Sequence, residues 1–200
     1  MTNPLIEMLN GEKKAQNAFT EKAIAHLHEY YLVGHVEEPS KYTEWFNQIR
    51  HAPPNDIIKI YINSYGGDLW PAIQLIRVIR EAKAPVIVSV EGACMSAATI
   101  IFLMADSHEI SPHSMFMFHN YSGGTIGKGG EMIDQIKHER KWSQKLLMEI
   151  YENFLTSDEI QAILDNKDIW MTAEEVVARL NKKAKSLKKN VKAKGKKLEE

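Results

Sequence analysis

The sequence predicts an α/β fold that is built from repeated βαβ units and continues into a long helix. Three observations predict it. Strand-like and helix-like segments alternate through the middle of the chain, one central strand-like run is almost continuously apolar, and a long amphipathic segment follows a glycine-rich stretch. A continuous apolar run is typical of a strand that is buried on both faces of a parallel sheet.

The first predicted unit begins with a short β run over Tyr30–Val33. An amphipathic helix over residues 42–50 follows, and a proline-containing turn ends it. Residues 56–63, DIIKIYIN, alternate and are rich in β-branched side chains, which predicts a strand. We expect Ser64–Asp68 to break this strand.

The second unit continues with an amphipathic helix over residues 69–82, for which Asp68 is the expected N-terminal cap. Pro85 stops this helix. Val86–Val90 is the nearly continuous apolar strand, and we expect Gly92 to end it.

The third part of the chain starts with a helix over residues 96–105 that is short of charge, and an apolar strand over residues 114–118 follows. The loop SGGTIGKGG then feeds a long helix over residues 131–155, which we expect to pack on another surface such as a second subunit. Its packing stripe has two polar members midway and comprises Ile133, Ile136, Arg140, Ser143, Leu147, Ile150 and Phe154. Two capping boxes, Thr156–Glu159 and Thr172–Glu175, open the last helices, and LDNKDIW between them is expected to be a loop.

The composition describes one ordinary globular domain, with 200 residues, 44% hydrophobic content and balanced charge. A single cysteine excludes an intramolecular disulfide and any multi-cysteine metal site, and it suits a reducing compartment. The N-terminus shows no secretory pattern, and no apolar run reaches the roughly 20 residues that a membrane span needs. We therefore expect a cytoplasmic protein without a membrane partner.

Residues 181–200 hold nine lysines and two glutamates. Such a run is most often a solvated, disordered tail, and this one has no aromatic residue for base stacking. We expect a disordered tail and no nucleic-acid partner.

Two potential nucleophiles lie close together in GACMSAAT, residues 92–99. Ser96 is at a strand-to-helix corner, where free backbone N–H groups stabilise developing negative charge, although a serine there is more commonly only the N-cap. Cys94 has an apolar setting and is expected to be a small buried hydrophobe.

A serine nucleophile needs a general base and a carboxylate to orient that base. His119 ends a strand that is predicted to lie in the same sheet, which is where open α/β sheets gather their sites. Asp165 and Asp168 are both available for the carboxylate, and their spacing does not choose between them.

The pair Gly66–Gly67 supplies a side-chain-free turn that can donate backbone N–H groups to an oxyanion. A glycine pair alone is usually only a turn. Neither nucleotide-binding glycine motif is present, and the histidine-containing segment 108–119 matches no metal-ligand spacing, so we expect no cofactor and no metal.

The order of these features resembles the ClpP-like serine peptidases, which belong to the crotonase-like superfamily. The resemblance rests on INSYGGD at 62–68, GACMSAAT at 92–99, PHSMFMFHN at 112–120 and DNKDIWMTAEEVV at 165–177, and it covers about residues 30–180. It implies repeated ββα and βαβ units, a protruding handle helix after the glycine-rich loop, and a strand that holds the substrate in extended form. We expect residues 1–29 to be partly helical or flexible.

The resemblance implies a serine endopeptidase with Ser96, His119 and an aspartate, for which Asp165 is the preferred position and Asp168 the alternative. Backbone N–H groups of Gly67, of Gly66 and of Ala97 would form the oxyanion hole. The implied partners are protein or peptide substrates and copies of the chain itself, in a heptameric ring or a stacked double ring that encloses a chamber.

Departures from the family pattern point to divergent or phage-encoded members. Tyr65 replaces a proline, Ala97–Ala98 replaces Met-Gly, and residues 1–29 do not match the axial loops that dock on a Clp-type ATPase unfoldase. The alternatives are a phage capsid-maturation protease that acts without an ATPase, a catalytically weak structural subunit, and a crotonase-type enzyme that stabilises thioester enolates.

Overall fold

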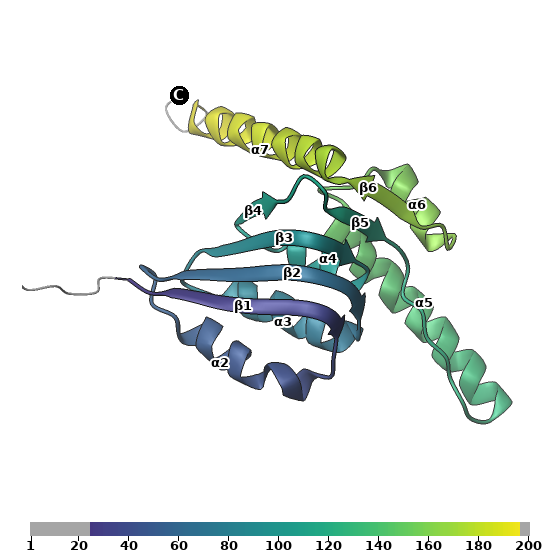
Figure 1. The fold of residues 1–200 in the computed structure, drawn as a ribbon. Helices are drawn as coiled ribbons and strands as arrows, with labels where there is room; N and C mark the ends of the chain where they lie inside the picture. The colour runs from purple at the N-terminus through teal and green to yellow at the C-terminus, as the bar shows by residue number, and fades with distance from the viewer. Residues whose placement is uncertain (1–24, 197–200) are drawn as a thin grey trace, which may run out of the picture.

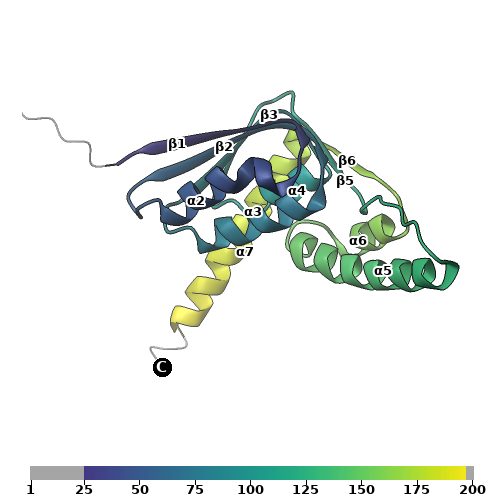
Figure 2. The same cartoon turned by 90° about the horizontal axis from the view of Figure 1, so that it is seen from below.

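The structure, a computed structural model, describes residues 25–196, with side chains through residue 184. A six-stranded sheet forms its centre. Helices α2, α3 and α4 cover one face of this sheet, and α5 extends away from it (Figures 1 and 2). The elements in chain order are β1 (Leu27–Val36), η1 (Pro39–Tyr42), α2 (Thr43–His51), β2 (Ile57–Gly67), α3 (Leu69–Glu81), β3 (Val86–Met95), α4 (Ala97–Phe102), β4 (Ser107–Ile110), β5 (Met115–Phe118), α5 (Gly129–Tyr151), α6 (Ser157–Leu164), β6 (Ile169–Thr172) and α7 (Ala173–Lys196).

The strand order is β1-β2-β3-β5-β6, and β4 pairs with β3. β3 has two partners on one side in succession, because residues 87–90 pair with β4 and residues 93–95 pair with β5. All of these pairs are parallel except β5 with β6, which is antiparallel. The carboxyl ends of β2, β3 and β5 therefore meet at one edge of the sheet, the usual location of a site in an open α/β fold. The predicted α/β class with its long protruding helix is confirmed.

The core lies between the sheet and the helices that cover it. Alternate residues of β2, namely Ile58, Ile60 and Ile62, have no exposed surface, because successive side chains of a strand point to opposite faces. Leu75 and Val78 of α3 are also fully buried. Each such side chain contributes about 1.5–3 kcal/mol of hydrophobic free energy, so this interface stabilises the sheet that carries the site.

The predicted helix caps are confirmed. The Asp68 carboxylate accepts a hydrogen bond of 2.9 Å from the Trp70 amide at the start of α3. In the capping box of α6, the Glu159 carboxylate accepts from the Thr156 amide at 2.8 Å, and Thr156 Oγ1 accepts from the Glu159 amide at 3.3 Å. Such caps fix where each helix starts, and with it where the preceding loop must end.

Two predicted strand ends are wrong. β2 continues through the glycine pair to Gly67, and β3 continues past Gly92 to Met95. Pairing with neighbouring strands outweighs the local turn chemistry here: after a register shift between Gly34 and His35, Val36 pairs with Gly67. Gly92 lies in the irregularity of the β2–β3 ladder that follows the Ile62–Val90 pair. Strand β4 lies where the sequence analysis predicted no element, and β6 lies partly within the segment expected to be a loop.

The ends of the chain differ from the expectations in part. Helix α7 continues to Lys196 and so contains residues 181–196, which were expected to be disordered. Lysine, alanine and leucine all favour the helix, and the segment extends a helix that is already nucleated. The expectation for residues 1–29 falls mainly outside the described residues, and β1 begins at Leu27.

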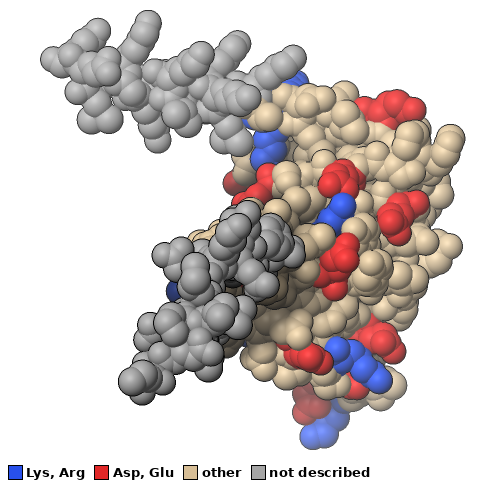
Figure 3. Space-filling model, turned by 60° about the vertical axis from the view of Figure 1, so that its left-hand side comes forward, with Lys and Arg blue, Asp and Glu red and all other residues tan. Residues whose placement is uncertain are grey.

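Charged residues are interspersed with neutral ones on the face shown in Figure 3. On the sheet, Lys59 forms an ion pair of 2.8 Å with Glu109, and its ammonium lies 4.9 Å from the centre of the Tyr61 ring. In the described part of the chain, every helix is too short or too polar to cross a lipid bilayer.

Candidate active site

Ser96 lies at the corner between β3 and α4, in an unusual backbone conformation. Its φ angle is 54°, a value that residues with a side chain rarely adopt and that costs about 1–3 kcal/mol. Two neighbours hold it there: the Ser96 amide donates to the Met117 carbonyl at 2.8 Å, and the Thr99 hydroxyl donates to the Ser96 carbonyl at 2.7 Å. The side chain does not cap α4, so the hydroxyl is available for another partner.

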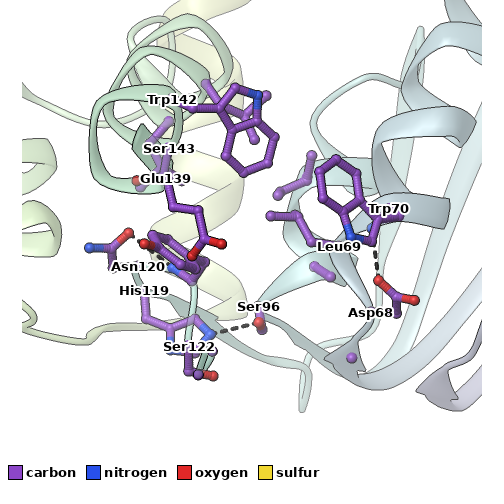
Figure 4. Close-up of a pocket in the computed structure, with 18 of the residues that line it drawn as sticks. Asp68, Leu69, Trp70, Ser96, His119, Asn120, Ser122, Glu139, Trp142 and Ser143 are labelled. Carbon is purple, nitrogen blue, oxygen red and sulfur yellow. Dashed lines mark hydrogen bonds between the residues drawn. The ribbon is translucent and has the colours of Figure 1, made fainter. Parts of the chain in front are cut away.

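That partner is His119. Its Nε2 atom lies 2.6 Å from Ser96 Oγ, a short hydrogen bond (Figure 4). Residues 93–95 of β3 pair with 115–117 of β5, which brings the serine and the histidine that follow these strands to the same edge. The structure thus brings together the two residues that the sequence singled out.

The carboxylate beside the imidazole belongs to Asp168. Its Oδ1 atom lies 3.9 Å from His119 Nδ1. The antiparallel register explains this position, since Phe118 pairs with Ile169 and the next residues along each strand, His119 and Asp168, are therefore neighbours.

This geometry favours Asp168, the alternative position, over Asp165, the position preferred from the sequence. Asp165 ends helix α6, and its carboxylate accepts a hydrogen bond of 3.2 Å from the Gln161 side chain, one turn earlier in the helix. Of the two aspartates, only Asp168 lies within 4 Å of a His119 ring nitrogen.

Gly66 packs directly against the serine corner. A Cβ atom at this position would lie 2.6 Å from Ser96 Cβ and 2.7 Å from the Met95 carbonyl oxygen, and the φ angle of 88° also favours glycine. Its amide is already occupied, because it donates to Ser64 Oγ at 3.1 Å. Of the three expected oxyanion donors, Gly67 and Ala97 line the cavity in front of Ser96, whereas the Gly66 amide has this partner within the chain.

Cys94 lies beneath the site without access to it. The side chain is completely buried, and burial raises the pKa of its thiol far above the ordinary value. A thiol in this environment stays protonated and unreactive, so the structure agrees with a packing role.

A cavity of about 670 Å³ opens in front of Ser96 and His119. One wall comes from the start of α3, with Leu69 and Trp70, and the opposite wall comes from α5, with Glu139 and Trp142 (Figure 4). The sequence reasoning missed this contribution of α5. One signal in the sequence could have indicated it. Arg140 and Ser143 interrupt the apolar stripe of α5, and Ser143 is a buried polar residue that lines the cavity.

The histidines considered as metal ligands have other roles. His108 Nε2 lies 2.8 Å from the Phe102 carbonyl oxygen, and burial lowers the pKa of its imidazole. Among the described residues, no three histidine, cysteine, aspartate or glutamate side chains are grouped closely enough to hold a metal ion.

Comparison with known proteins agrees with this arrangement. Residues 28–179 match the family model described as Clp protease. The ATP-dependent Clp protease proteolytic subunit 1 of Salinibacter ruber is 30% identical over 122 residues, which are 59% of this chain and 52% of that protein. Subunit 2 of Treponema denticola is 33% identical over 122 residues, or 60% of this chain and 61% of that protein. The corresponding subunit of Bacteroides fragilis is 29% identical over 125 residues, or 61% and 60%.

The chain thus spans between about half and three fifths of the length of these relatives. The family model, in contrast, covers the sheet from β1 to β6, together with Ser96, His119 and Asp168. On this match, the chain belongs to the Clp protease family.

Proposed function

We propose that the protein is a serine endopeptidase that hydrolyses peptide bonds of protein substrates. The observation that carries this proposal is the 2.6 Å hydrogen bond between Ser96 Oγ and His119 Nε2, two residues that line the cavity. A hydroxyl paired with a general base in this way is the requirement for an activated nucleophile. A structural subunit without activity would have no need for this pair or for the strained backbone at Ser96.

In the proposed reaction, His119 Nε2 removes the proton from Ser96 Oγ while the oxygen attacks the peptide carbonyl. The carbonyl oxygen becomes an oxyanion, which the amides of Gly67 and Ala97 stabilise. Ala97 is the first residue of α4, and the first amides of a helix have no partner within it. The imidazolium then protonates the leaving amine, and water, deprotonated by His119, releases the acyl group from the serine.

Asp168 is proposed to hold the imidazole in the tautomer that presents an unprotonated Nε2 to the serine. The separation of 3.9 Å is longer than a hydrogen bond. Catalytic hydrogen bonds are often long in the absence of substrate and shorten when it binds, and Asp168 is half exposed at the start of a short strand, where a small movement closes the distance.

Labelling with a fluorophosphonate tests the activity and the nucleophile together. We expect one covalent adduct per chain, located at Ser96 by mass spectrometry of the digested protein, and no adduct in Ser96→Ala. Ser107→Ala is the control, because Ser107 is an exposed serine of β4 outside the cavity. An unlabelled wild-type protein, or an adduct at Cys94, would contradict the proposal.

We further propose that residues 30–180 form the peptidase unit and that copies of it assemble through α5 into a heptameric ring or a stacked double ring. Support comes from exposed apolar side chains on α5, where Ile133, Ile136 and Met148 are 55%, 53% and 49% exposed. Light scattering after size-exclusion chromatography measures the assembly, and a monomer at micromolar concentration would contradict it.

The three relatives compared above are named as proteolytic subunits of an ATP-dependent protease. For this chain we propose that cleavage of unstructured peptides needs no Clp-type ATPase, because a single chain brings Ser96 and His119 together beside a cavity of about 670 Å³. Cleavage of an unstructured peptide by the purified chain, without ATPase, tests this proposal. Peptide cleavage that requires the ATPase would contradict it.

A further inference from the structure

The cavity in front of Ser96 combines an apolar floor with negative charge, and this combination bears on which peptide bonds are cleaved. The cavity includes Gly67, Ser96 and Ala97 in its wall. Consider a bound peptide whose reacting carbonyl carbon lies at Ser96 Oγ and whose carbonyl oxygen points to the amides of Gly67 and Ala97. The side chain of the residue that carries this carbonyl then lies in the cavity. The cavity lining therefore selects the residue on the amino side of the cleaved bond.

The apolar part of the cavity lining suits a long aliphatic chain. It comprises Leu69, Ile100, Leu146 and Leu147, from α3, α4 and α5, and is called the apolar floor below. A volume of about 670 Å³ is large enough for the longest natural side chains. Contact with these residues would stabilise a run of methylene groups by the hydrophobic effect.

Two indole rings stand at the upper end of the cavity. The centres of the Trp70 and Trp142 rings are 5.4 Å apart, with an angle of 32° between the ring planes. Because this distance leaves no room for a group between the rings, a ligand stacks on an outer face of one ring. Trp70 is 62% exposed, so a face is accessible. Indole faces attract cations, and the planar guanidinium group of arginine stacks on them.

Glu139 adds a carboxylate on the same side. Figure 4 shows its side chain reaching from α5 into the cavity between Trp142 and the His119 side. The Gln135 side chain donates a hydrogen bond of 2.7 Å to Glu139 Oε1 and so holds the carboxylate in place. The pKa of Tyr121, which lines the cavity as well, is raised by burial and by the neighbouring charge of Glu139.

The charge of the lining is one-sided. Glu139 and Asp68 contribute carboxylates, and His119 and His138 contribute imidazoles, whereas none of the described residues that line the cavity is lysine or arginine. An acidic side chain would meet the like charge of these two carboxylates, and a neutral one would leave the Glu139 carboxylate without a cation.

We infer that the protein prefers a basic residue, arginine or lysine, on the amino side of the cleaved bond, with its methylene groups on the apolar floor and its cationic end between the indole surface and Glu139. This inference rests on the proposed peptidase activity and adds the substrate class. Glu139 is then a residue that determines specificity through direct contact with the substrate.

Peptidyl diphenyl phosphonates test the preference without an ATPase or a folded substrate. Two reagents would differ only in the residue next to phosphorus, arginine in one and citrulline in the other, because citrulline has nearly the shape of arginine without its charge. We expect the arginine reagent to inactivate the wild-type protein about tenfold faster than the citrulline reagent, because only arginine forms the cation–indole contact and the partly exposed ion pair.

Glu139→Gln should reduce this ratio to within about twofold, because the amide keeps the size of the side chain and removes its charge. Asp134→Asn is the matched control: it removes the same charge from the same helix at an exposed position outside the cavity lining, and the tenfold ratio should persist. Equal rates for the two reagents in the wild-type protein, or an unchanged ratio in Glu139→Gln, would overturn the inference.

A small fluorophosphonate without a peptide distinguishes failure of the specificity inference from failure of the peptidase proposal. If it labels Ser96 while the arginine and citrulline reagents react equally fast, the peptidase proposal stands and the specificity inference is refuted. If it does not label the wild-type protein, the peptidase proposal is refuted and the specificity inference falls with it.

Discussion

Replacing Gly66 by alanine probes the contact between β2 and the serine corner. The new Cβ atom would lie 2.6 Å from Ser96 Cβ, 2.7 Å from the Met95 carbonyl oxygen and 3.0 Å from the Ala97 amide nitrogen. Two of these neighbours are backbone atoms, which move only if the whole corner moves. The substitution therefore displaces the proposed nucleophile although it introduces no polar or charged group.

Two costs add up at this position. Alanine at a φ angle of 88° is disfavoured by about 1–2 kcal/mol, and relief of an overpacked contact costs about 1–3 kcal/mol. We expect Gly66→Ala to lower the free energy of unfolding by about 2–5 kcal/mol. Since a displacement of about 1 Å can reduce a rate about a hundredfold, we also expect fluorophosphonate labelling of Ser96 to slow by about that factor.

Gly34→Ala separates the two costs. Gly34 has a φ angle of 76°, but a Cβ atom there would meet nothing within 4 Å. This variant should lose only the conformational part, about 1–2 kcal/mol, and should label at the wild-type rate. Urea unfolding followed by circular dichroism measures the stability, and the rate of probe incorporation measures the site. If both variants lose the same stability and label equally fast, the close packing of Gly66 on Ser96 has no functional consequence and the reasoning is refuted.

Three further predictions concern the aspartates, a partly exposed ion pair and the cysteine. Asp168→Asn should slow labelling of Ser96 about a hundredfold to ten-thousandfold, whereas Asp165→Asn should leave the rate unchanged; equal effects would remove the proposed role of Asp168. Arg179 holds Glu159 in a two-bond ion pair that lowers the pKa of Glu159 to about 2, so the stabilisation is complete above pH 4.5 and is lost as the pH falls to 2. Glu159→Gln should accordingly cost about 1–2 kcal/mol at pH 7 and nothing near pH 2, measured by urea unfolding at both values, and a cost independent of pH would contradict this. Cys94 should react with a thiol reagent only in denaturant, and reaction in the native protein, followed by absorbance, would show that the site is less closed than its burial indicates.

Much of the fold could be predicted because its signals are local. The alternation of residues 56–63 and the capping by Asp68 each depend on side chains within a few positions of one another; the strand is present, although it continues to Gly67, and the cap is confirmed. Ser96 and His119 could be proposed because each follows a strand of one parallel sheet, and such strands end at the same edge. The resemblance to a family then made these two positions stand out among the other serines and histidines.

The choice of aspartate and the walls of the cavity could not be predicted in the same way. Asp165 and Asp168 are only three positions apart, and the difference between them depends on β6, a four-residue strand that has too little periodicity to be detected. Once Phe118 pairs with Ile169, antiparallel register alone places Asp168 beside His119. A shift in this pairing would place a different residue there.

The positions of Glu139 and Trp142 in the cavity wall could not be predicted from the sequence either. Their positions in the sequence mark them as members of one long helix, and they face Trp70 only because α5 packs beside the start of α3. Local patterns thus predicted most of the strands and the caps, because these rest on interactions between near neighbours in the chain, and the shared edge of the sheet pointed to Ser96 and His119 as a candidate pair. Packing decided which carboxylate lies beside the histidine and which side chains line the cavity, because these contacts join segments whose relative placement no local pattern encodes.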